Sequence, residues 1–191
     1  MRPKKNSISY TGPILGLVIL SSLVGWGIAT AEQRSPRLTL NTLKNSEYDT
    51  GEGTRKVRLR NGVFESGRPG GDYLHAEFEE AAFGDLNGDQ VEDAAVIFWW
   101  SGGGTGAFVT LSAVINQDGK SHNIAAQLIG DRVHVTSIGI KSGIIVIHMK
   151  DHGPGDGLAR ATVPKVVKYQ LFRGKLKKTG EESRREPTKR N

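Results

Sequence analysis

Residues 94–100 form an unbroken apolar run, and this run constrains the fold of the 191-residue chain more than any other feature. The run does not alternate with polar residues, so it fits a strand that is buried on both faces. We therefore predict that it is the central strand of a sheet, with other parts of the chain covering both sides. The 25 glycines and the length suit one turn-rich domain.

Shorter patterns typical of strands lie on both sides of this run. Residues 56–60 alternate apolar with basic, and Asn61 and Gly62, which tolerate positive φ, lead into residues 63–65; together they predict a β-hairpin. Asp118 and Gly119 give a second hairpin signal. The remaining predicted strands cover residues 73–79, 108–115, 123–129, 132–140, 144–149 and 166–172.

The apolar parity changes within residues 132–140, which predicts a bulge near Thr136 or Ser137. About nine short strands separated by turns predict an antiparallel all-β domain, either a sandwich or a partly open barrel. The chain contains no cysteine, so its stability must come from the core and from any bound ion.

The N-terminal segment, residues 1–31, has the pattern of an export signal. Three basic residues precede an uncharged stretch over 6–31, and residues 29–31 (Ala-Thr-Ala) match the small-x-small pattern of signal-peptide cleavage sites. The alternative is an uncleaved anchor helix in contact with the membrane, because residues 14–31 form an apolar stretch of 18 residues. Both interpretations predict an exported body, periplasmic or extracellular.

The formal net charge of +6 is concentrated at the two ends of the chain. Residues 1–31 carry +3 and residues 173–191 carry +5, whereas residues 32–172 sum to −2. The basicity therefore predicts no specific nucleic-acid partner. A basic C-terminal tail favours contact with an anionic envelope polymer or with lipid head groups, or it serves solubility alone.

These observations divide the chain into four segments. Residues 1–31 are a signal peptide or membrane anchor, and residues 32–54 are a linker with a short docking segment marked by Leu38, Leu40 and Leu43. Residues 55–173 form the all-β domain. Residues 174–191 contain almost no apolar side chain and are predicted to be a disordered basic tail.

The segment 85–93, Asp-Leu-Asn-Gly-Asp-Gln-Val-Glu-Asp, has oxygen-bearing side chains at its first, third, fifth and ninth positions. Ca²⁺ takes about six to eight oxygen ligands, which a tightly coiled backbone with alternate side chains converging supplies from one short segment. The spacing predicts one structural Ca²⁺. The predicted metal ligands are Asp85, Asn87, Asp89, the main-chain carbonyl of Val91, and Asp93. The alternative is a series of Asx turns in a metal-free scaffold.

With Phe83 and Gly84 before it and residues 94–96 after it, this segment resembles the calcium loop of FG-GAP repeats, which lies between strands in integrin-like propeller blades. It is not an EF-hand, because Val96 stands where the EF-hand places a bidentate glutamate. Gln90 replaces the glycine usual at position six, and a left-handed backbone there is strained by about 1 kcal/mol. A single copy of the loop excludes a complete propeller.

A wider likeness runs through residues 43–48, 83–96 and 152–156. There the chain is similar to a group of small exported bacterial proteins that carry one such loop each. This resemblance implies the fold and the export of the protein. It implies no activity.

Residues 148–157 carry the alternative function, a hydrolase-type enzyme using Asp151, His152 and Asp156. His148 and His152 are four residues apart, a spacing that aligns ligands on a helix but leaves them unconstrained where a strand runs into a loop. No nucleophile elbow, HExxH zinc motif or phosphate loop is present in the sequence. We therefore predict no catalytic residues, and a binding or interaction role for the exported domain.

Overall fold

The structure is a computed structural model, and it describes residues 36–53, 55–68, 70–157 and 160–183. The chain divides into two compact units, Met1–Gln33 and Arg34–Asn191, and all described residues belong to the second. The predicted signal peptide or anchor over residues 1–31 lies outside the described residues. Within the described part, no helix has both the length and the apolar character needed to cross a membrane.

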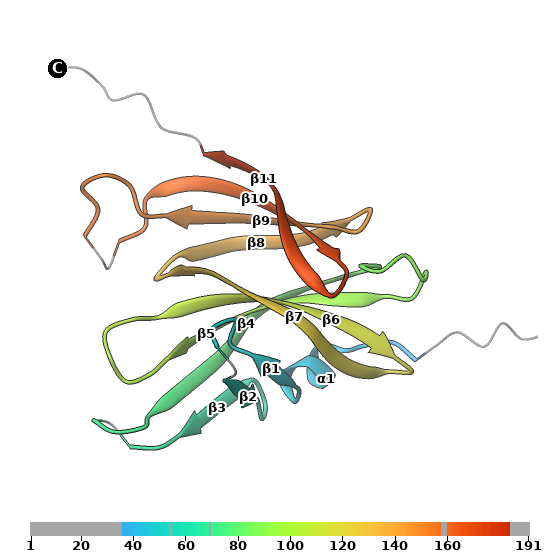
Figure 1. Cartoon of the computed structure of the whole chain (residues 1–191), viewed down its shortest axis with the longest axis horizontal. Coiled ribbons are helices and arrows are strands. Elements are labelled where there is room, and N and C mark those ends of the chain that lie inside the picture. The colour runs from blue at the N-terminus through green and yellow to red at the C-terminus, as the bar shows by residue number, and fades with distance from the viewer. Residues whose placement is uncertain (1–35, 54, 69, 158–159, 184–191) are drawn as a thin grey trace, which may run out of the picture. The chain divides into compact units, whose positions relative to one another are not determined.

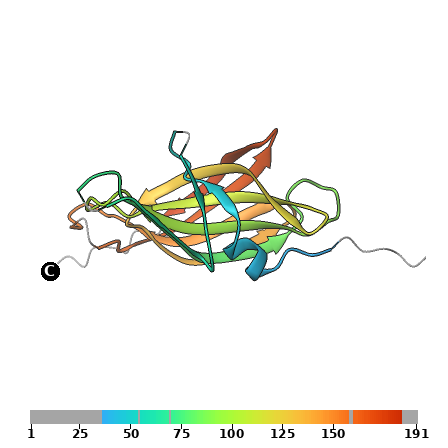
Figure 2. The same cartoon turned by 90° about the horizontal axis from the view of Figure 1, so that it is seen from below.

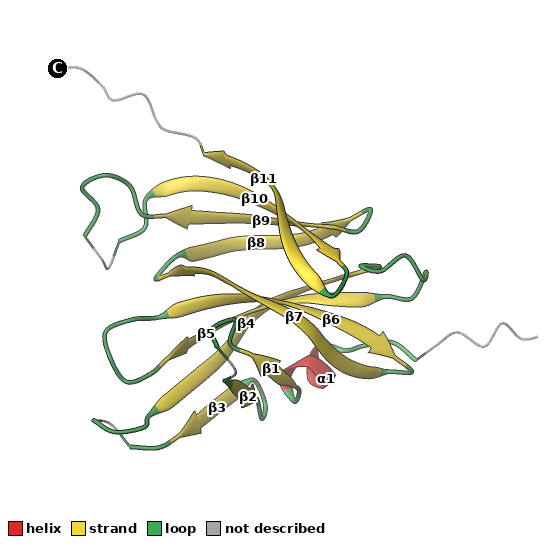
Figure 3. Ribbon diagram, in the orientation of Figure 1, coloured by secondary structure: helices red, strands yellow, loops and turns green. Residues whose placement is uncertain are grey.

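One short helix and eleven strands make up the described part of the second unit (Figures 1 and 3). The N-terminal elements are α1 (Leu40–Lys44), β1 (Glu47–Asp49) and β2 (Lys56–Arg58). They are followed by β3 (Val63–Ser66), β4 (Leu74–Gly84), β5 (Asp93–Ser101), β6 (Phe108–Gln117) and β7 (Lys120–Asp131). The last four strands are β8 (His134–Lys141), β9 (Ile144–Asp151), β10 (Val163–Phe172) and β11 (Lys175–Ser183).

The strands form three antiparallel sheets, which confirms the predicted antiparallel all-β class. A five-stranded sheet has the order β3-β4-β5-β6-β7, a four-stranded sheet has the order β11-β10-β9-β8, and β1 pairs with β2. Consecutive strands are neighbours, so both large sheets are meanders. In the part of the chain that the structure describes, neither sheet closes into a barrel.

The prediction that residues 94–100 form the central strand is confirmed, because β5 is the third of five strands. Its alternate side chains enter two different cores. Ala95 and Ile97 belong to a first core, which they share with Leu111 of β6 and with Ile145 and Ile147 of β9. This first core therefore joins the five-stranded sheet to the four-stranded sheet.

The opposite face of β5 faces a second core, to which Ala94, Val96 and Phe98 belong. Residues 38–59, here called the N-terminal cover, supply the other half of this core. The Tyr48 ring lies 5.4 Å from that of Phe98, centroid to centroid, and its hydroxyl donates to the Leu43 carbonyl at 2.7 Å. Figure 2 shows α1 and β1 lying across the five-stranded sheet.

The N-terminal cover corrects the predicted linker over residues 32–54. Leu38 and Leu43 are buried, as a docking segment requires, but Leu40 is 49% exposed. Tyr48 and Val57 are fully buried. The cover is therefore part of the folded unit, because the apolar run in β5 needs burial on this face as well.

The hairpin predicted around Asn61 and Gly62 is only partly formed. The turn is present, with φ of 52° and 90° at these two residues, but its arms diverge after the single bridge between Arg60 and Val63. β2 pairs with β1, and β3 pairs with β4. By contrast, the register shift between Val135 and Ser137 confirms the predicted bulge in β8.

The predicted disordered tail over 174–191 is wrong for residues 175–183, which form β11. This strand pairs with β10 through a turn in which Arg173 has φ of 51° and Gly174 has φ of 70°. Leu176, opposite Leu171, packs against the first core. An edge strand needs few apolar side chains, because backbone pairing holds it to its neighbour. Residues 184–191 lie outside the described part.

Candidate metal centre

The segment 85–93 connects β4 to β5, and these two strands are paired up to the loop, with Gly84 opposite Asp93. Leu86 is 4% exposed and belongs to the first core, so it anchors the start of the loop. Gly88 and Gln90 have φ of 87° and 66°. The left-handed backbone expected at Gln90 is therefore present, and it coils the loop despite the strain.

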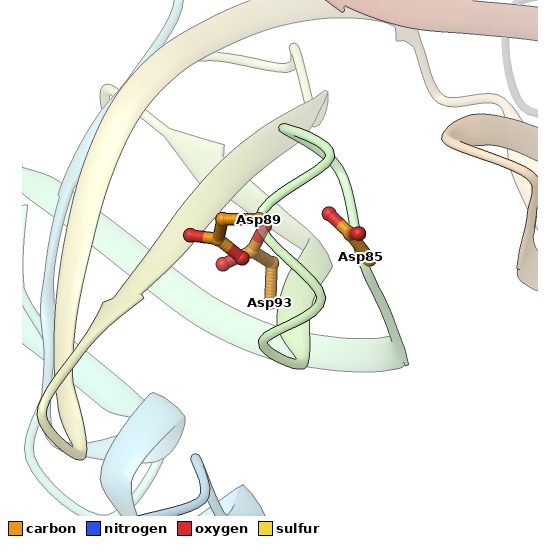
Figure 4. Close-up of side chains that lie close together, drawn as sticks. All are labelled: Asp85, Asp89 and Asp93. Atoms are coloured by element: carbon orange, nitrogen blue, oxygen red, sulfur yellow. The ribbon is translucent and has the colours of Figure 1, made fainter. Parts of the chain in front are cut away.

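The loop brings the carboxylates of Asp85, Asp89 and Asp93 together (Figure 4). Each offers an oxygen, and these oxygens lie within 4.8 Å of one another. Among the described residues, no other group of three or more His, Cys, Asp or Glu side chains meets this criterion. The sequence therefore predicted correctly which carboxylates converge.

Asp93 is the buried member of this carboxylate cluster, with no exposed surface. Its Oδ2 accepts the N–H of Leu86 at 3.0 Å and its Oδ1 accepts the N–H of Asn116 at 2.9 Å. Burial raises the pKa of Asp93, and repulsion from the other two carboxylates adds to the effect. The two N–H bonds offset only part of this increase.

The pKa of Asp85 shifts in the opposite direction from that of Asp93. Its Oδ1 accepts the N–H groups of Asn87 at 3.1 Å and Gly88 at 2.6 Å, and its Oδ2 accepts the N–H of Gln90 at 3.0 Å. Desolvation is the largest single influence and opposes ionisation, but the N–H bonds together outweigh it. The pKa of Asp85 is therefore lowered.

Asn87 and Asp89 link the two ends of the cluster. The amide of Asn87 donates to Asp89 Oδ2 at 2.8 Å, and Asn87 Oδ1 accepts the N–H of Asp89 at 2.9 Å. Asp89 Oδ1 accepts the N–H of Val91 at 2.8 Å. Asn87 thus directs its amide nitrogen toward the Asp89 carboxylate, and Asn87 and the Val91 carbonyl both stay predicted ligands.

The donor set fits a hard divalent cation. Each carboxylate oxygen has two acceptor lone pairs, and both oxygens of Asp89 and of Asp93 accept one N–H each. One lone pair on each of these four oxygens is thus left for a metal. Oxygen-only ligands of this kind suit Ca²⁺ or Mg²⁺ better than softer metals.

Asn116 is a supporting residue that sequence reasoning missed. It is 5% exposed near the end of β6, and its side-chain amide donates to the carbonyls of Pro36 at 2.9 Å and Glu92 at 3.2 Å. Together with its backbone bond to Asp93, these contacts tie the loop to β6 and to Pro36, which precedes the N-terminal cover. An asparagine directly after the apolar residues 113–115 was the available signal.

The residues of the alternative enzyme site each have their own structural partner. Asp151 accepts from Lys165 Nζ at 2.6 Å, and Asp156 accepts the N–H of Gly153 at 2.8 Å. The His152 ring pairs through Nε2 with the carbonyl of Asp131 at 3.1 Å. These contacts hold the loop in place.

Both carboxyls of this alternative site, Asp151 and Asp156, have a lowered pKa. Desolvation opposes ionisation of Asp151, but Lys165 and the N–H of His152 outweigh it. The N–H of Gly153 and the Thr162 hydroxyl lower the pKa of Asp156. Neither carboxyl has the raised pKa that a general acid at neutral pH requires.

Comparison of this chain with protein-family models, with curated proteins and with solved structures finds no match to any of the three.

Proposed function

We propose that this protein is an exported, non-enzymatic domain with a binding role, and that one structural Ca²⁺ in the loop 85–93 stabilises it. The convergence of the Asp85, Asp89 and Asp93 oxygens within 4.8 Å supports this proposal above all other observations. Three carboxylates at this separation repel one another, and a divalent cation converts that repulsion into attraction.

The ion would act as a staple between strands. Asp85 follows β4, Asp93 begins β5, and the N–H of Asn116 joins Asp93 to β6. A cation held by these carboxylates would thus fix three consecutive strands at one end of the sheet. With a dissociation constant of about 10⁻⁴ M and about 1 mM Ca²⁺, the added stability would be about 1.4 kcal/mol.

A thermal melt of the unit Arg34–Asn191 in 1 mM Ca²⁺ and in chelator tests the proposal, because both cores of this unit are built from its own residues. We expect the melting temperature to be several degrees higher in Ca²⁺. Asp89→Ala should abolish the difference.

Glu92→Ala is the matched control. Glu92 is an exposed carboxylate of the same loop but is not part of the cluster, so this variant loses the same charge and should keep the response to Ca²⁺. Equal melting temperatures of the unsubstituted protein in Ca²⁺ and in chelator would refute the staple and favour the metal-free scaffold. An equal loss of the Ca²⁺ response in Asp89→Ala and Glu92→Ala would show that the stabilisation is a nonspecific effect of charge.

A further inference from the structure

The outer face of the four-stranded sheet consists of the side chains that alternate, along each strand, with those that enter the first core. In β9, Ile145, Ile147 and Met149 enter the core, so the residues between them project outward. In β10, Val167 and Tyr169 enter the core. Opposite residues in an antiparallel pair share a face, so the register assigns alternate side chains of β8 and β11 to this outer face as well.

Positive charge dominates this outer face. Its basic side chains are Lys141, Lys150, Lys168, Lys175 and Lys177, with the histidines His134 and His148. On the described strands, the one acidic side chain assigned to this face is Glu182, which pairs with Lys168 at 3.1 Å. With both histidines neutral, these five lysines and Glu182 give the face four net positive charges.

Apolar side chains lie among these cations. Ile144, Val146 and Val166 are partly exposed, and Phe172 is 45% exposed. Lys177 Nζ lies 4.2 Å from the centroid of the Phe172 ring. A shallow pocket of about 600 Å³ on the same face is lined by residues that include Val146, His148, Val166 and Lys168.

The corresponding outer face of the five-stranded sheet lies under the N-terminal cover, which contributes to the second core and contacts β7. The chain thus covers the face whose outward side chains are apolar. The outer face of the four-stranded sheet instead mixes lysines with aliphatic and aromatic side chains. This composition suits contact with water and with an ionic partner.

We propose that the outer face of β8–β11 docks onto a bilayer that contains anionic phospholipids. Cationic side chains near an anionic membrane each contribute about 1 kcal/mol, and interspersed apolar side chains enter the headgroup boundary. A soluble anionic polymer would satisfy the lysines but would gain little from the exposed Phe172. This inference extends the proposed binding role, because it identifies the partner, and it requires no bound Ca²⁺.

Vesicle flotation with the unit Arg34–Asn191 in chelator tests the inference. We expect binding to vesicles of phosphatidylglycerol and phosphatidylcholine, weakening at high salt, and none to vesicles of phosphatidylcholine alone. Lys175→Glu with Lys177→Glu should reduce the partition constant about tenfold or more. Phe172→Ala should reduce it by a smaller factor, about threefold.

Two controls locate the contact. Arg60→Glu with Lys120→Glu reverses two exposed charges on other elements and should leave binding unchanged, with thermal melts confirming that every variant folds. A chain ending at Ser183 retains the face and should still bind.

Four results would overturn the proposal: equal binding to neutral vesicles, equal loss in the two double variants, loss of binding in the shortened chain, or binding only when Ca²⁺ is present. Capture of a soluble polyanion such as polyphosphate without vesicle binding would instead identify a polymer-binding face. The Ca²⁺ melt is independent of all these results, so failure of either proposal leaves the other to be judged separately.

Discussion

Two loops of this domain carry aspartates, and the carboxylates of the two loops have different kinds of partner. In residues 85–93, three carboxylates face one another and accept only N–H groups; no described ion pair includes any of them. In residues 151–163, Asp151 pairs with Lys165, and Asp156 accepts from the Thr162 hydroxyl at 2.7 Å. The second loop obtains its partners from the chain, whereas the first concentrates three carboxylates without a basic side chain paired to any of them among the described residues.

The largest expected difference between the loops comes from removing one carboxylate from each. Asp93→Ala leaves the buried N–H groups of Leu86 and Asn116 without an acceptor, which should lower the free energy of unfolding by about 2 to 4 kcal/mol. Asp156→Ala should cost less, because solvent reaches that site. Urea unfolding of both variants in chelator measures the contrast. A larger loss of unfolding free energy in the Asp156 variant would show that residues 151–163, and not residues 85–93, contribute more to stability.

The response to Ca²⁺ separates the loops more sharply. Asp151→Asn and Asp156→Ala should each keep the full stabilisation of about 1.4 kcal/mol between chelator and 1 mM Ca²⁺, because the cluster is untouched. Paired urea titrations at the two Ca²⁺ levels give this difference directly. A reduced response in either variant would place a metal ligand in residues 151–163.

A smaller effect is expected from the strained residue of the first loop. Gln90→Gly removes the left-handed strain at φ of 66° but adds backbone freedom to the unfolded chain, so a net gain of about 0.5 kcal/mol or less is expected. Ser142→Gly is the control, because Ser142 has φ of 50° in the turn between β8 and β9. Both variants should be stabilised in urea, and isothermal titration should show tighter Ca²⁺ binding only for the Gln90 variant.

The smallest expected effect appears in acid. The pKa of Asp151 is lowered in the folded protein, so its contribution is present above the unfolded value, near 3.9, and is lost as the pH falls through the folded value. Asp151→Asn should therefore cost about 0.5 kcal/mol or less at pH 6, and progressively less as the pH falls from about 4 toward 2. Urea midpoints across this range test the sign; a constant difference between variant and wild type would contradict it.

Local patterns predicted much of the fold. The apolar run identified β5 as central, and the parity change in residues 132–140 located the bulge between Val135 and Ser137. The partners of β2 and β3 were not predictable from the turn at Asn61 and Gly62, because pairing with β1 and β4 depends on contacts distant in sequence. β11 was missed because charged edge strands resemble disordered tails in composition.

The part of the site that comes from one short segment of the chain was predictable from the sequence. Alternating oxygen side chains in residues 85–93 correctly indicated which carboxylates converge. The support from Asn116 was not visible, because that residue is 23 positions from Asp93 in the chain. Likewise, the gathering of lysines from β8 to β11 on one outer face was not visible, because it depends on strand pairing and parity.

The N-terminal cover also bears on the order of folding. Both large sheets are meanders, so most of their pairings close short loops, whereas Tyr48 reaches Phe98 across fifty residues. Contacts of high sequence separation form slowly. We expect the meanders to assemble first and the cover to dock late, so that Leu43→Ala speeds unfolding far more than it slows folding in stopped-flow measurements. Until the cover docks, one apolar face of the five-stranded sheet stays open to other molecules, and this interval is when the protein is most prone to aggregate.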